Sequence, residues 1–173
     1  IAAMAGTGLA VKPVVLTVTH AVSAPLMLPG GALAGGLYMM WLVMAVGLTG
    51  KRGSATLCGL IQAVLVLITG LLGSHGLLSL VSYTLPGLAA DFGLLLMRHR
   101  CCCRLCCFVA CMLANIAGTA VVNLIFFSMP LIPFLLTLFV SAFSGGIGGL
   151  LAWELLRALK KYGIGGHAYA GRA

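Results

Sequence analysis

"PGGALAGGLYMMWLVMAVGLTGKRGSAT", residues 29–56, is one apolar stretch enclosed by signals that end a helix. Its centre, residues 32–48, contains no charged residue. The Pro-Gly-Gly before it favours a break in the chain, and Gly50, Lys51 and Arg52 after it indicate a turn followed by two positive charges. Because a helix needs about 20 apolar residues to cross a bilayer, the stretch predicts a membrane-spanning helix that ends in a basic loop.

The rest of the chain has the same organisation. Hydrophobic residues make up 62% of it and charged residues only 7%, with a mean hydropathy of +1.19, whereas a soluble domain carries about 25% charged residues. Breakers and charges divide the sequence into segments 2–24, 32–48, 57–72, 77–97, 105–127 and 134–159. We therefore expect an all-α integral membrane protein: one domain, residues 1–173, of six transmembrane helices. Because it opens without an initiator methionine, we also expect a start, tag or signal to be missing before Ile1.

The basic residues predict the orientation of these helices. Nine of the ten Lys and Arg lie at or beyond the ends of the second, fourth and sixth segments: Lys51, Arg52, Arg98, Arg100, Arg104, Arg157, Lys160, Lys161 and Arg172. The opposite connections, 25–31, 73–76 and 128–133, contain none. The positive-inside rule places the basic side in the cytoplasm, so both termini are expected there, in a multi-pass protein of the bacterial cytoplasmic membrane. Anionic lipid headgroups account for the net charge of +8 without a nucleic-acid partner.

Five of the seven cysteines lie in "MRHRCCCRLCCF", residues 97–108. The cytoplasm is reducing, which disfavours disulfides. Adjacent residues on a helix point about 100° apart, so these thiols do not converge on one ion. We interpret them as small apolar side chains beside a basic anchor, with acylation of a juxtamembrane cysteine as the weaker alternative. No metal site and no cofactor is expected.

Two charged residues, Lys12 and Asp91, lie well away from the ends of predicted spans, where charge is costly. Lys12 lies 13 residues from Pro25 and Asp91 lies 13 residues from Leu78, at the outer ends of their spans, which places both at a depth of roughly 20 Å. Equal depth predicts a structural ion pair between Lys12 and Asp91. The alternative for Lys12 is that its long side chain reaches the inner membrane edge. Glu154 and Arg157 are spaced for a local pair near the end of the last span.

Polar and aromatic residues in the outer half of the spans predict a pocket open to the outside. The candidate substrate-binding residues are His20, Tyr38, Trp41, Gln62, His75, Ser79, Tyr83 and Asn123. Apolar walls with a few placed donors and acceptors are typical of small-molecule sites. Singly, the amides are as well explained by hydrogen bonds between helices, and the aromatic residues by anchoring at the membrane interface.

The sequence argues against an enzyme. It has only two acidic residues, and no nucleophile, base and orienting acid can be assembled from it. It also lacks a phosphate-binding glycine loop ending in Lys-Ser or Lys-Thr. Any ATP hydrolysis on which the protein depends therefore has to occur in a partner.

Rows of small residues occur in the first and last spans. Ala2, Gly6 and Ala10 are four residues apart, and "SAFSGGIGGLL" contains Ala142, Gly145, Gly146 and Gly149. Such rows let helices approach closely in lipid. They are explained either by packing within the chain or by a partner helix.

With these features the chain resembles the substrate-binding S component of an energy-coupling factor (ECF) type ABC transporter. The similarity rests on the six spans, the Ala2, Gly6 and Ala10 row, and the stretch from "PGG" through "KRGSAT". It implies a subunit that captures a vitamin or related micronutrient from outside. It also implies a transmembrane coupling protein, contacted by Ala2, Gly6 and Ala10, and two ATPase subunits. Gly6 stands where the family's motif has alanine.

"GKRGSA" is similar to the branch of the family that takes up thiamine or its hydroxymethylpyrimidine precursor. The expected mechanism is binding followed by relocation of the loaded protein, with the loop around Pro25, Met27 and Pro29 closing over the solute. The alternative is a free-standing six-span permease or channel for a small polar solute, in which Lys12 and Asp91 gate the path.

Overall fold

The computed structural model describes residues 1–23, 30–70, 78–97, 103–127 and 130–163. These residues form the helices α1 (Ala2–Ser23), α2 (Gly30–Thr49), α3 (Ser54–Thr69), α4 (Leu78–Leu96), α5 (Arg104–Val122), the π-helix η2 (Asn123–Phe127) and α6 (Leu131–Lys161). The expected all-helical fold is confirmed. Four helices in the described ranges are long and apolar enough to cross a membrane, in the segments Ala32–Thr49, Leu78–Leu96, Arg104–Ile125 and Leu131–Lys161. The apolar stretches Ala2–Val15 and Ser54–Thr69 are shorter.

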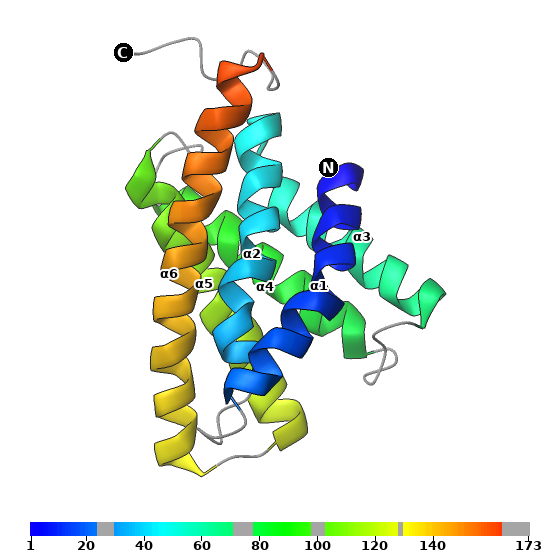
Figure 1. The fold of residues 1–173 in the computed structure, drawn as a ribbon, viewed down its shortest axis with the longest axis vertical. Helices are drawn as coiled ribbons and strands as arrows, with labels where there is room; N and C mark the ends of the chain where they lie inside the picture. The colour runs from blue at the N-terminus through cyan, green and yellow to red at the C-terminus, as the bar shows by residue number, and fades with distance from the viewer. Residues whose placement is uncertain (24–29, 71–77, 98–102, 128–129, 164–173) are drawn as a thin grey trace.

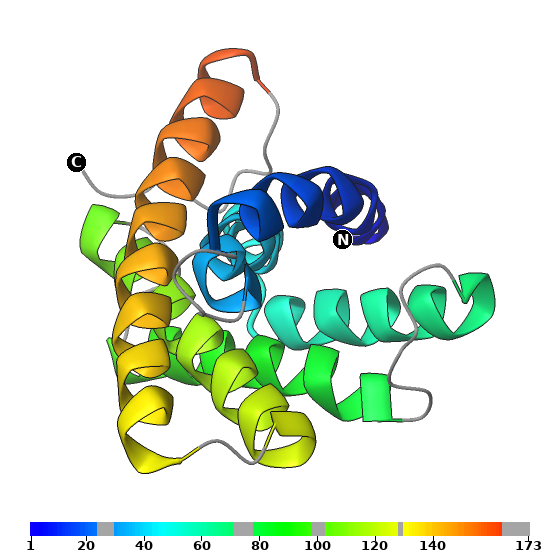
Figure 2. The same cartoon turned by 60° about the horizontal axis from the view of Figure 1, so that its bottom comes forward.

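Helix α2 lies at the centre of the bundle and packs against α1, α5 and α6 (Figure 1). Helices α3 and α4 lie side by side and cross the direction of α2 and α6, as Figure 2 shows. Helix α4 also packs against α5, which joins the α3–α4 pair to the rest of the bundle. Large apolar side chains such as Ile68, Phe92 and Phe143 stay exposed on the outside, as expected for a surface that faces lipid.

Glycines bring α6 into backbone contact with its neighbours. A Cβ atom on Gly148 would lie 2.1 Å from the carbonyl oxygen of Gly36 in α2. Cβ atoms on Gly145 and Gly149 would lie 2.9 and 2.4 Å from backbone oxygens of α5. The small-residue row of the last span is therefore explained by packing within the chain.

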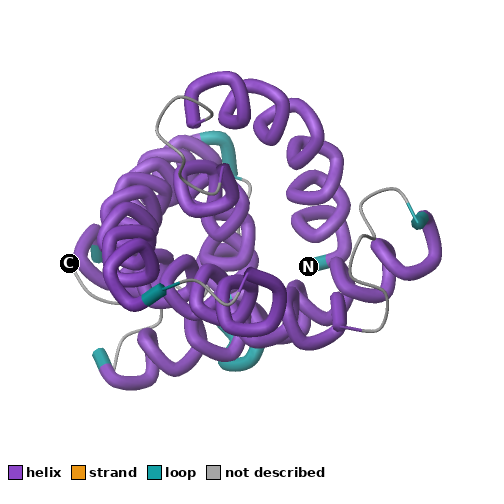
Figure 3. Tube along the Cα trace, turned by 90° about the horizontal axis from the view of Figure 1, so that it is seen from below, coloured by secondary structure: helices purple, strands orange, loops and turns teal. Residues whose placement is uncertain are grey.

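The row of small residues in the first span faces outward, away from the other helices. Ala2 and Ala10 are exposed, and a Cβ atom on Gly6 would meet nothing within 4 Å. Helix α1 also bends midway along its length (Figures 1 and 3). Pro13 lies inside it, and a proline in a helix removes a backbone hydrogen bond and kinks the axis.

The cysteines after the fourth helix pack as small side chains. Cys106, Cys107 and Cys111 are buried in the core. The Cys103 sulfur accepts a hydrogen bond from the backbone N–H of Cys106 at 3.3 Å and so caps α5. The interpretation of the cluster as small apolar residues is confirmed for these buried cysteines, while Cys101 and Cys102 lie outside the described residues.

The "GKRGSAT" segment builds the turn between α2 and α3. Gly50 and Gly53 have φ values of 64° and 80°, a backbone conformation that residues with a Cβ atom rarely adopt. Ser54 closes the turn by donating to the Lys51 carbonyl at 2.9 Å. Because Gly53 is the N-cap of α3, no N-cap side chain satisfies the first N–H groups of this helix.

Asp91 of α4 supplies that missing cap, and this overturns the predicted Lys12–Asp91 ion pair. Its Oδ2 accepts from the Thr56 backbone N–H at 2.8 Å and from the Thr56 hydroxyl at 2.6 Å. A carboxylate is stabilised at a helix N-terminus by the helix dipole. The side chain of Lys12 instead contacts the hydroxyl of Tyr83, so equal depth did not mean proximity.

The predicted Glu154–Arg157 pair is also wrong. Glu154 Oε1 lies 2.5 Å from Arg104 Nη2 on α5. The neighbouring helix thus provides a partner that spacing within α6 could not reveal. Both side chains are exposed, and such surface pairs contribute about 0–1 kcal/mol to stability.

The Asp91 cap predicts how substitutions combine. Asp91→Ala and Thr56→Val should show a coupling energy of roughly 0.5–3 kcal/mol in detergent unfolding, since each removes the same hydrogen bond. Asp91→Ala and Lys12→Met should be additive. An interaction between Lys12 and Asp91 as large as that between Thr56 and Asp91 would contradict the geometry.

The glycine contacts predict a second stability effect. Gly148→Ala should lower the melting temperature, because the added Cβ meets the Gly36 backbone. Overpacking costs about 1–3 kcal/mol, which outweighs the gain of roughly 1 kcal/mol in helix propensity. Gly6→Ala is the matched control, and its melting temperature should be unchanged or higher. If the two substitutions changed the melting temperature equally, the result would argue against backbone contact between α2 and α6.

Candidate solute-binding cavity

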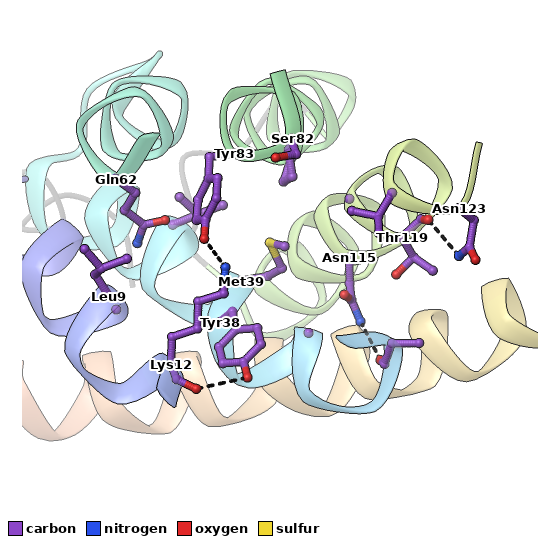
Figure 4. Close-up of a pocket in the computed structure, with 17 residues that line it drawn as sticks. Leu9, Lys12, Tyr38, Met39, Gln62, Ser82, Tyr83, Asn115, Thr119 and Asn123 are labelled. Atoms are coloured by element: carbon purple, nitrogen blue, oxygen red, sulfur yellow. Dashed lines mark hydrogen bonds between the residues drawn. The ribbon is translucent and has the colours of Figure 1, made fainter. Parts of the chain in front are cut away.

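A cavity of about 210 Å³ lies between α1, α2, α3, α4 and the α5–η2 segment (Figure 4). Its lining residues are Gly8, Leu9, Lys12, Ala32, Gly35, Tyr38, Met39, Leu42, Gln62, Ser82, Tyr83, Pro86, Asn115, Gly118, Thr119, Val122 and Asn123. Apolar side chains make most of the wall, and the polar ones form two groups that Figure 4 shows on either side of Met39.

The first polar group surrounds Lys12. Its ammonium donates to the hydroxyl of Tyr83 and lies 4.0 Å from the centroid of the Tyr83 ring and 5.6 Å from that of Tyr38. The Tyr38 hydroxyl in turn donates to the Lys12 backbone carbonyl at 3.3 Å. Gln62 of α3 lines the same end. Helices far apart in sequence therefore bring one cation and two phenols together.

The second polar group lies along α5. Asn115 uses its amide nitrogen to join helices, donating to the carbonyls of Ala32 in α2 at 3.3 Å and Ser141 in α6 at 2.7 Å. A Cβ atom on Gly35 would lie 1.8 Å from the Asn115 Oδ1, so only glycine at position 35 permits this approach. Asn115 therefore forms hydrogen bonds that join α5 to α2 and α6.

Asn123 stands where α5 passes into the π-helix η2. Its amide nitrogen donates to the Thr119 carbonyl at 2.9 Å. Its Oδ1 is buried and has no hydrogen-bond partner among the described residues. A buried acceptor without a donor is costly, and π-helical turns often occur at functional sites. Asn123 therefore offers an unused acceptor at the cavity.

Four of the eight predicted substrate-binding residues line this cavity: Tyr38, Gln62, Tyr83 and Asn123. Trp41 and Ser79 do not line it; the Trp41 indole N–H and the Ser79 hydroxyl are buried without a partner in the described part of the chain. The side chain of His20 and all of His75 lie outside the described residues.

Sequence reasoning missed several lining residues. Lys12 was singled out as a charge within the membrane but assigned to an ion pair. Asn115, Thr119 and Asn123 recur every four residues, a spacing that puts polar side chains on one helix face and could have identified the α5 wall. Gly8 and Gly35 gave no such signal, because their role depends on what lies opposite.

The lining residues offer an ammonium group, phenols, amides and hydroxyls, and none of them is His, Cys, Asp or Glu. Across the described ranges, no group of three such residues is arranged to hold a metal ion. Metal sites in proteins are built mainly from imidazole, thiolate and carboxylate ligands. The lining side chains of the cavity can form hydrogen bonds and stack on flat rings.

Comparison with known proteins agrees with a transport component. Residues 1–117 match the family described as "ABC-type cobalt transport system, permease component". The fold is similar to a solved structure described as "Crystal structure of an S-component of ECF transporter", with a TM-score of 0.71 and 21% sequence identity, covering 93% of this chain and 84% of that one. A comparison with curated proteins finds no match.

Proposed function

Because the chain belongs to the family of permease components of ABC-type cobalt transport systems and has the fold of an ECF S component, we propose that it is a binding subunit that captures a small organic solute. The family places the chain among transport components and not among enzymes. The observation that carries the proposal is the cavity enclosed by five helices and η2, which has apolar walls and two polar ends. This is the usual character of a small-molecule site.

The family description names cobalt, whereas the resemblance found in the sequence implies a vitamin or related micronutrient. The chemistry of the lining residues favours the organic solute. Lys12 is positively charged and lines the cavity, and it would repel a divalent cation. Tyr38 and Tyr83 supply aromatic rings on which a flat ring system can stack. Thiamine and its pyrimidine precursor remain the named candidates.

For the topology we propose six spans with both termini in the cytoplasm of a bacterium. The N-terminus and the basic end of α6 lie at the same end of the bundle (Figure 1). Lys51 and Arg52 are exposed in the α2–α3 turn. Local thinning of the bilayer and flanking polar side chains that reach the interface would let the shorter apolar stretches of α1 and α3 enter the membrane with the other four helices.

For the partners we propose a transmembrane coupling protein and two ATPase subunits. Ala2, Gly6 and Ala10 leave a flat, small-residue surface on the outside of α1, and such surfaces support close helix packing in lipid. The rival function, a free-standing permease, needs none of these partners.

Substitutions at two glycines of α1 test solute binding and association with the coupling protein separately. Gly6→Leu adds a side chain on the outer face, where its Cβ atom would meet nothing within 4 Å; solute binding should persist while complex formation and uptake fail. Gly8→Leu is the matched variant on the cavity side, where even a Cβ would lie 2.6 Å from Gln62 Nε2. It should abolish binding because the leucine fills the cavity.

The two variants are compared by ligand-induced thermal shift, by co-purification with the coupling protein, and by uptake into cells. Loss of binding in folded Gly6→Leu protein would remove the outer face from the proposal. Uptake by proteoliposomes that contain this chain alone would favour the permease.

Mass spectrometry of small molecules released from the purified protein identifies the cargo directly. We expect one vitamin-like compound at near one-to-one stoichiometry, and titration with that compound should raise the melting temperature because it binds only the folded state. Protein that releases nothing and is stabilised by no micronutrient would contradict the capture function.

A further inference from the structure

We infer that Asn123 sets the specificity of the cavity, because its side-chain oxygen accepts a hydrogen bond from an amino, ring N–H or hydroxyl group of the solute. A solute without such a donor at this position is rejected. The inference deepens the proposed function and rests on it, since it concerns the same cavity. The sequence predicted only that Asn123 binds substrate, whereas the structure assigns the contact a direction, with the protein as acceptor.

The first step is that a local hydrogen bond fixes the orientation of the Asn123 amide. Its nitrogen donates to the Thr119 carbonyl at 2.9 Å (Figure 4). A carbonyl oxygen can only accept, so the opposite orientation of the amide would bring two acceptors together. The nitrogen is therefore held at Thr119, and the side-chain oxygen is left as an acceptor that this bond does not satisfy.

The second step is that the described part of the chain provides no donor for this oxygen. Asn123 is 2% exposed, and its Oδ1 is buried without a hydrogen-bond partner among the described residues. Most buried side-chain polar atoms in proteins have a partner, because an unpaired one is costly. Asn123 also lines the cavity, so a bound solute can supply the donor.

The third step is that other polar groups of the cavity wall are engaged in holding helices together. The Asn115 amide nitrogen donates to carbonyls of α2 and α6. The Tyr38 hydroxyl donates to the Lys12 backbone carbonyl, and the Lys12 ammonium donates to the Tyr83 hydroxyl. These bonds form between parts of the protein, whereas the oxygen of Asn123 is left for the solute.

The fourth step is that Asn123 is held firmly enough to discriminate. It follows Asn115 by eight residues, or roughly two helical turns, on the wall that Asn115 bonds to α2 and α6. Because Thr119 retains the amide nitrogen, the residue cannot turn to offer an N–H to a solute that presents an acceptor. A site built to accept from a donor strongly rejects an analogue that lacks it.

The test uses the purified full chain and begins with the hydroxymethylpyrimidine precursor of thiamine. The other water-soluble vitamins are titrated in the same thermal-shift assay. In the tightest binder, each amino or hydroxyl group is replaced by hydrogen and each ring N–H is methylated, one position at a time. One of these changes should weaken binding to the wild-type chain roughly 10- to 100-fold, because it leaves the Asn123 oxygen unpaired.

Asn123→Leu should weaken binding of the parent compound by a similar factor. In this variant, removal of the same donor from the compound should change binding by less than about twofold, because the acceptor is already gone. Thr137→Val is the matched control. Its hydroxyl also donates to the carbonyl four residues earlier, that of Pro133 at 2.7 Å, but Thr137 does not line the cavity. This variant should keep the affinity and the discrimination of the wild type.

Asn123→Asp keeps the inference testable if the leucine variant fails to fold. In its protonated form, the carboxyl group has an O–H for the Thr119 carbonyl and a second oxygen that accepts. The variant should therefore still bind the parent compound more tightly than the analogue without the donor. Equal binding of the two compounds by a folded Asn123→Asp chain would overturn the inference.

The outcomes distinguish the inference from the proposed function. If no single change to the compound weakens wild-type binding more than about twofold, a buried water satisfies the Asn123 oxygen; the inference then fails while the capture function stands. The inference fails in the same way if Asn123→Leu still rejects the same analogue. A wild-type chain that neither releases nor binds any compound would contradict the capture function itself. Discrimination that is present in the wild type and Thr137→Val and absent in Asn123→Leu supports both.

Discussion

The structure depends on backbone contact between α6 and its neighbours α2 and α5. In lipid there is little hydrophobic gain from bringing helices together, so association relies on close packing and on hydrogen bonds between them. Gly36 and Gly148 allow α2 and α6 to touch, and Asn115 then reaches a carbonyl on each of these helices. This three-helix contact fixes the α5 wall, against which the other helices enclose the cavity.

Much of the fold could be predicted because lipid imposes a simple rule on sequence: long apolar segments, ended by breakers and charges. The helices and their order follow from that rule. The cavity was predicted only in part. Tyr38, Gln62, Tyr83 and Asn123 line it as expected, since polar and aromatic side chains inside spans are few enough to stand out.

The remaining site residues could not be predicted because they depend on how helices rotate and cross. Lys12 and Asp91 have similar depths, yet one faces the tyrosines and the other the first turn of α3. The depth of a residue in the membrane does not say in which direction its side chain points around the helix axis. Gly53, the N-cap of α3, has no side chain to accept from the first N–H groups of the helix, and so the cap comes from a carboxylate on another helix. This can be recognised only once the first residue of α3 is known.

The two faces of α1 have a thermodynamic consequence. Gly6 lies on the outer surface, whereas Gly8 and Lys12, within the next two turns, line the cavity. A ligand on either face that alters the tilt of this segment changes the affinity of the other face by the same factor, because linkage between two binding equilibria is reciprocal. A change in the tilt of this one bent helix can thus couple binding in the cavity to binding on the outer face of α1, without any large rearrangement of the bundle.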